Sequence, residues 1–91
     1  MDLKEKVIVA LKSAIVDAWL RLQDDDGISG IVVSAKFIGM SPLDRQKLID
    51  RALRNSAVEF SKQERRNILA IAALTPAEFE TVDPAFLGTG R

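Results

Sequence analysis

The dipeptide Asp26-Gly27 constrains the fold of this 91-residue chain more than any other feature, because it separates two segments with strand-like patterns. Residues 18–23 alternate apolar and polar side chains, and residues 28–37 are rich in β-branched residues. Type I′ turns need positive φ at both central residues, which Asp-Gly tolerates, so the sequence predicts an antiparallel hairpin. The residues expected on its core face are Ala18, Leu20, Leu22, Ile31, Val33, Ala35 and Phe37.

A strand-to-helix junction follows the hairpin. Gly39 ends the second strand, Ser41 can cap a helix, Pro42 suits the first helical position, and Asp44 favours the positive helix N-terminus. The helix places one apolar stripe against the sheet, made of Leu48, Ile49, Ala52 and Leu53. Such crossovers usually connect parallel strands, so a third strand parallel to the second is expected.

The segment 62–74 admits two interpretations. Ser61 and Glu64 form a capping box that favours a short helix over 61–66, and the apolar run after it suits a buried strand over 67–74. The alanines in the run would also suit one continuous helix over 62–74. The strand is the favoured interpretation.

Helices are predicted at both ends of the chain. Asp2 and Glu5 form a capping box before a helix over 3–15, and Thr75-Pro76 opens a last short helix with Phe79 and Val82 facing inward. The chain is therefore expected to be an α+β sandwich, α-β-β-α-(α)-β-α, with a three-stranded mixed sheet. It forms a single domain over 1–82, followed by a loosely ordered tail over 83–91.

The residue types exclude several classes of chemistry. The chain has no histidine and no cysteine, so it lacks an imidazole base, a thiolate nucleophile and soft ligands for zinc or an iron–sulfur cluster. No convergent set of Asp, Glu or Lys replaces them, and a non-enzymatic protein without a cofactor is expected. The longest apolar run, Ile68 to Leu74, is far shorter than a membrane span, and a cytoplasmic location is the default expectation.

Three motifs resemble the BolA family, whose fold is related to class II KH domains. The family's Val-Val-x-Ser-x-x-Phe-x-Gly strand end resembles residues 32–39, and its hydrophobic-x-Arg-His-Arg-hydrophobic helix start resembles residues 43–49. Its Thr-Pro-x-Glu-Trp motif resembles residues 75–79, where Phe79 replaces the tryptophan. The three motifs occur in the family's order over roughly residues 15 to 80.

The resemblance implies a role in iron–sulfur or redox homeostasis with a monothiol glutaredoxin as partner. The family's cluster-ligating histidine, however, falls on Asn67, and its helix histidine falls on Gln46. Neither amide is a good iron ligand beside thiolate or imidazole. We therefore expect an adaptor or regulator that acts through protein contacts, without the cluster ligand. Trp19, opposite the core stripe of its strand, is a candidate contact residue.

A weak KH-like nucleic-acid-binding module is the alternative. The whole chain has thirteen basic and thirteen acidic residues, but the segment 36–66 has eight basic residues against four acidic ones. Its candidate surface consists of Arg45, Lys47, Arg51, Arg54, Arg65 and Arg66. Against this alternative, the Gly-x-x-Gly clamp of KH domains is absent. The run Asp24 to Gly27 lacks the spacing of a calcium loop and suits a polar hairpin turn better.

Overall fold

The computed structural model describes residues 1–86 and their side chains as far as Thr81. In chain order the elements are α1 (Leu3–Ala14), β1 (Trp19–Asp24), β2 (Ile28–Val33), the 3₁₀ helix η1 (Ala35–Phe37), α2 (Pro42–Arg54), α3 (Lys62–Arg66), β3 (Ile68–Leu74) and α4 (Pro76–Phe86). This order is the predicted α-β-β-α-(α)-β-α arrangement, with η1 added.

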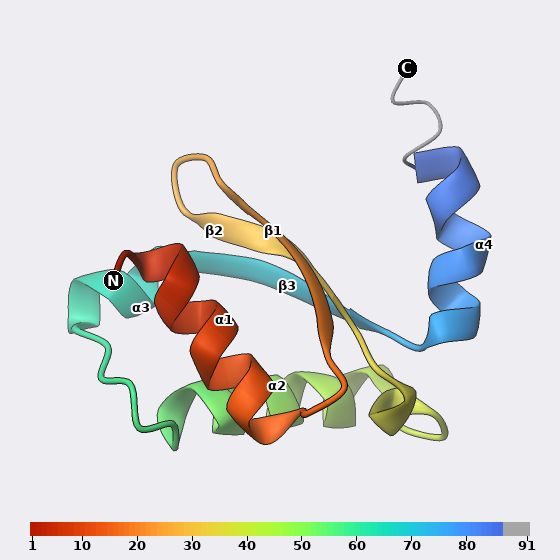
Figure 1. Cartoon of the computed structure of the whole chain (residues 1–91), viewed down its shortest axis with the longest axis horizontal. Coiled ribbons are helices and arrows are strands. Elements are labelled where there is room, and N and C mark those ends of the chain that lie inside the picture. Colours follow the sequence, from red (N-terminus) through yellow and green to blue (C-terminus); the bar gives the residue numbers. More distant parts are fainter. Residues whose placement is uncertain (87–91) are drawn as a thin grey trace.

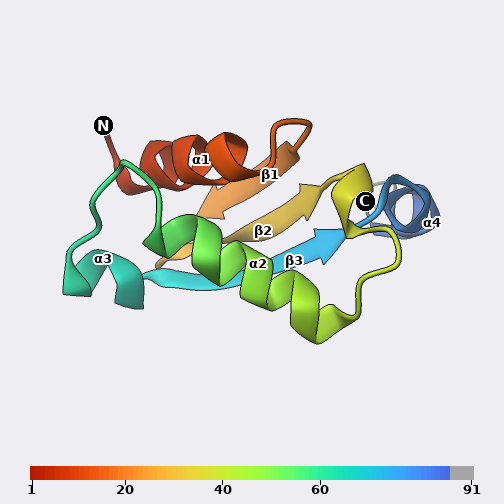
Figure 2. The ribbon, with the colours of Figure 1, turned by 90° about the horizontal axis from the view of Figure 1, so that it is seen from below.

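The three strands form one mixed sheet in the order β1-β2-β3, with β1 antiparallel and β3 parallel to β2. Helices α1 and α2 lie side by side on one face of the sheet (Figure 1). Helix α4 stands at the end of the sheet where β3 ends and points away from α1 and α2. Seen from below, α1 lies along the β1 side of the sheet and α2 along the β3 side (Figure 2). The predicted fold class is confirmed.

The hairpin at Asp26-Gly27 is confirmed, with a loop one residue longer than a two-residue turn. Both residues have positive φ, 57° for Asp26 and 124° for Gly27. The first paired residues are Asp24 and Ile28, so the loop contains three residues, and the Asp25 N–H donates to the Gly27 carbonyl.

The second strand is shorter than predicted, and the face that it turns to the helices was assigned wrongly, although Val33 is buried as predicted. The longer loop sets a register in which Leu20 of β1 lies directly opposite Val32 of β2. Directly opposed residues of an antiparallel pair have their side chains on the same face of the sheet. Val32 therefore joins Leu20 on the helix-covered face, and Ile31 lies on the opposite face. Beyond Val33 the chain leaves the sheet for η1, which exposes Ala35 and buries Phe37 completely.

The short-helix-and-strand interpretation of 62–74 is confirmed, and the continuous helix is wrong. Helix α3 has the predicted capping box between Ser61 and Glu64, and β3 follows it directly. Helix α2 has Ser41 as its N-cap and buries Ile49 and Ala52 from the predicted stripe. The largest fully buried side chains are Val7, Leu11, Ile15, Ile28, Val32, Phe37 and Ser34.

The last helix is longer than predicted. It continues to Phe86, past residue 83, the expected start of the tail. Phe79 is half-buried, with its ring centroid 5.0 Å from that of Trp19. The side chain of Val82 and residues 87–91 lie outside the described part of the chain.

Candidate functional site

Asn67, the residue that the family resemblance aligns with the cluster ligand, makes backbone hydrogen bonds at the junction of α3 and β3. It is the C-cap of α3, and its N–H donates to the carbonyls of Gln63 and Glu64. Its carbonyl accepts a 2.6 Å hydrogen bond from the Ile28 N–H, which joins the start of β3 to β2. Its side chain is exposed and could contact a partner, but it offers only an amide.

Gln46 lies elsewhere and binds the edge of the sheet. Its Nε2 donates a 3.0 Å hydrogen bond to the carbonyl of Ile71. Ile71 is four residues beyond Asn67 along β3, which corresponds to roughly 13 Å of strand. The two ligand-equivalent positions therefore do not converge on one point.

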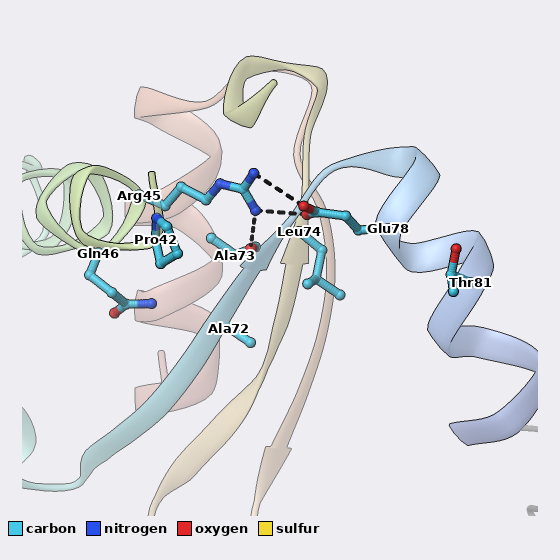
Figure 3. A pocket seen from close by; sticks show the side chains of 8 residues that line it. All are labelled: Pro42, Arg45, Gln46, Ala72, Ala73, Leu74, Glu78 and Thr81. Carbon is cyan, nitrogen blue, oxygen red and sulfur yellow. Dashed lines mark hydrogen bonds and ion pairs between the residues drawn. The ribbon is translucent and has the colours of Figure 1, made fainter. Parts of the chain in front are cut away.

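A groove of about 550 Å³ runs beside β3, between α2 and α4 (Figure 3). It is lined mainly by apolar atoms, and its lining residues are Pro42, Arg45, Gln46, Ala72, Ala73, Leu74, Glu78 and Thr81. At the start of α2, Leu43 exposes 64% of its surface, and in the preceding loop Ile38 exposes 66%. The groove is thus a mainly apolar surface formed by α2 and by the consecutive elements β3 and α4.

Arg45 lies at one end of this groove and donates four hydrogen bonds to protein atoms. Its guanidinium donates to both Glu78 carboxylate oxygens, at 2.7 and 3.2 Å, and to the Ala73 carbonyl at 3.1 Å (Figure 3). It also donates to the Met40 carbonyl at 3.0 Å. These bonds connect α2, β3 and α4. The Arg45 hydrogen bonds, followed by that from the Thr75 N–H, lower the pKa of Glu78 to about 2.

The other basic candidates gather on the outer side of α2 and α3. Arg54 and Arg65 line a hollow of about 250 Å³ together with Asp50. Lys47, Arg51 and Arg54 line an adjoining hollow of about 310 Å³. The structure therefore brings four of the six predicted basic residues together and directs Arg45 elsewhere.

Arg66 is exposed on α3 and lines neither hollow. Among the side chains as far as Thr81, the ion pairs within 4.0 Å are Lys6–Glu64 and Arg45–Glu78, so the basic residues around the two hollows have no carboxylate that close.

Besides the Lys6–Glu64 pair and the Gln46–Ile71 hydrogen bond, sequence reasoning missed two further polar contacts that hold distant segments together. One is the Arg45–Glu78 pair, for which the only local signal was the helix start at Thr75. The other joins Asp17 to Ser34, whose hydroxyl donates a 2.6 Å hydrogen bond to the carboxylate. That bond is the main cause of the lowered pKa of Asp17.

The described residues contain no group of three or more acidic side chains that could hold a metal ion. Among the same residues, no helix has both the length and the apolar character needed to cross a membrane.

Comparison with known proteins bears on the family. No protein-family model matches the sequence, and no curated protein matches it. Among solved structures, a Bol-like protein from Babesia bovis is 29% identical, with a TM-score of 0.65, over 91% of this chain and 95% of that one. A BolA protein homologue from Coxiella burnetii is 20% identical, with a TM-score of 0.55, over 87% of this chain and 92% of that one. The second match supports the fold, and the first extends the likeness to sequence. Together with the order of the three motifs, these matches support a BolA-like family for this chain.

Proposed function

We propose that this chain is a non-enzymatic BolA-like adaptor that binds a protein partner through the groove beside β3. The observation that carries the proposal is the groove itself, an open, mainly apolar hollow of about 550 Å³. Apolar hollows of this size suit side chains of a partner. A monothiol glutaredoxin, the partner that the family resemblance implies, is the first candidate.

The residue types support binding rather than catalysis or cluster ligation. The chain has no histidine or cysteine, and the amide of Gln46 already donates to the sheet edge. The one charged pair in the groove, Arg45 with Glu78, is held by four hydrogen bonds to protein atoms. Complex formation would therefore rest on protein contacts, with no iron–sulfur cluster shared between the partners.

Two alanines of β3 provide a matched test. Ala72 lines the groove, while Ala70 is exposed two residues earlier on the same face of the strand. Binding to a cluster-free monothiol glutaredoxin is measured by calorimetry. Ala72→Glu should weaken it at least tenfold, because a carboxylate would be buried in an apolar contact, and Ala70→Glu should leave it unchanged. Equal effects of the two variants, or absence of binding by the natural chain, would refute the proposal.

Weak nucleic-acid binding is a second candidate function, supported by the two adjoining basic hollows. Arg54 lines both hollows, and Arg51 lines the second. Binding to a single-stranded oligonucleotide should weaken with rising salt and be independent of sequence, because only Lys and Arg contacts to phosphate are available. Charge reversal at both arginines should also weaken binding of the oligonucleotide. Base-specific binding, or binding insensitive to salt, would contradict this mode.

A further inference from the structure

The end of α2, helix α3 and the start of β3 come together (Figure 2) and line a hollow of about 250 Å³. Its floor is apolar, because Phe60 is buried and Leu53 and Ile68 are half-buried. Its rim is charged, because Asp50, Arg54 and Arg65 are exposed around it. The hollow thus combines an apolar contact surface with charges of both signs.

The charged groups of this rim do not pair with one another. Among the described side chains, no ion pair within 4.0 Å includes Asp50, Arg54 or Arg65. Asp50 and Arg54 lie one turn apart on α2, a spacing at which opposite charges on a helix often interact. Glu64, the chain neighbour of Arg65, instead pairs with Lys6 of α1 at 2.8 Å. The two guanidinium groups and the carboxylate of the rim can therefore each bind a charged group of a ligand.

The adjoining hollow of about 310 Å³ shares two of these charged groups but has no apolar floor. Asp50 and Arg54 line it as well, and its other lining residues are Lys47, Arg51 and Asn55. All of these side chains are polar or charged. A ligand that has both charges and an apolar part therefore fits the hollow over Phe60 better than the adjoining one.

We propose that the hollow over Phe60 binds a free apolar α-amino acid in its zwitterionic form. The carboxylate of the ligand binds Arg54 and Arg65, because guanidinium groups suit carboxylates in charge and geometry. The ammonium group binds the Asp50 carboxylate, and the apolar side chain packs on the floor of the hollow. A simple anion would meet both arginines but would also face the negative charge of Asp50, and a simple cation would face the arginines.

Three ligands with the same carbon skeleton separate the contributions of the charges. They are L-leucine, isocaproate, which lacks the ammonium group, and isoamylamine, which lacks the carboxylate. Amide spectra of the ¹⁵N-labelled chain are recorded at millimolar ligand, because so small a ligand binds an open hollow weakly. Leucine should shift Phe60, Arg65 and Ile68 most and bind about threefold to fivefold more tightly than either analogue, the effect of one exposed charge pair. L-Serine should bind more weakly than leucine, because it lacks the apolar side chain.

Neutral variants of the rim assign the two ends of the ligand. Asp50→Asn should reverse the preference, so that isocaproate binds more tightly than leucine. Arg65→Gln should weaken leucine and isocaproate about threefold to fivefold and leave isoamylamine unchanged. Arg66→Gln is the matched control, because Arg66 is exposed on the same helix and lines neither hollow. Arg51→Gln should weaken oligonucleotide binding without changing leucine binding, so failure of the nucleic-acid proposal and failure of this one are distinguishable.

Several outcomes would overturn the inference. One is equal binding of leucine and isocaproate, or of leucine and serine, to the natural chain. Another is the absence of shifts at millimolar leucine. Shifts centred on Lys47 and Asn55 would place the ligand in the adjoining hollow. An effect of Arg66→Gln as large as that of Arg65→Gln would show that the positive charge of α3, and not a site at the hollow, attracts the carboxylate.

Discussion

At the scale of single residues, Gly30 shows how closely the hairpin strands approach. It pairs with Leu22 and has φ of 151°, and a Cβ at this position would collide with the backbone of Arg21 and Leu22. Gly30→Ala should lower the free energy of unfolding by at least about 3 kcal/mol, because backbone strain costs about 1–3 kcal/mol and the strands must also separate. Gly39 is the comparison, since its φ is 82° but a methyl group there would have no other atom within 4 Å. Gly39→Ala should cost only about 1 kcal/mol, and equal losses in urea denaturation would contradict this account.

The cap of α2 supplies a second prediction at this scale. Ser41 accepts a hydrogen bond from the Asp44 N–H through its hydroxyl, at 3.1 Å. Ser41→Ala should lower the free energy of unfolding by about 1 kcal/mol, since one orphan N–H of the helix loses its acceptor. Ser13→Ala is the control, because that hydroxyl only donates to the Val9 carbonyl within α1. A loss of stability in the control as large as in the cap variant would show that capping is not the cause.

At the scale of elements, the attachment of α4 depends on the charge of Glu78. Its pKa is lowered from 4.5 to about 2, mainly by hydrogen bonds from Arg45. A lowered folded-state pKa stabilises the protein above the unfolded value, and this contribution is lost as pH falls through the folded value. The stability difference between the natural chain and Glu78→Gln should therefore be constant above about pH 4.5 and shrink toward pH 2. Acid titrations of unfolding for the natural chain and the variant measure this difference.

The helices and strands also show which structural features the local sequence determines and which it does not. Helix starts at Asp2, Ser41 and Ser61 were predictable because each cap acts within three residues of its helix. The face that β2 turns to the helices was not predictable, because one extra residue in the hairpin loop exchanges the two faces of the strand. The partner of Arg45 was not either, because Glu78 lies 33 residues away and meets it only after β3 has joined the sheet.

At the scale of the whole molecule, the position of Asn67 leads to a prediction about iron. If the family's partner surface is retained, a cluster-loaded monothiol glutaredoxin meets an amide where the family resemblance implies an imidazole, and no histidine or cysteine elsewhere in the chain can replace it. An amide is a poor ligand for iron beside thiolate or imidazole. The natural chain should therefore be colourless when purified and leave the visible spectrum of the loaded glutaredoxin unchanged.

Asn67→His should shift that spectrum, because an exposed side chain at the start of β3 would then present a ring nitrogen to the cluster. Asn55→His is a matched control, since Asn55 is likewise an exposed helix C-cap, at the end of α2. The same shift from both variants would indicate adventitious iron binding by any surface imidazole. A stoichiometric cluster retained by the natural chain would show that its carboxylates can ligate iron, and would overturn an adaptor role based on protein contacts alone.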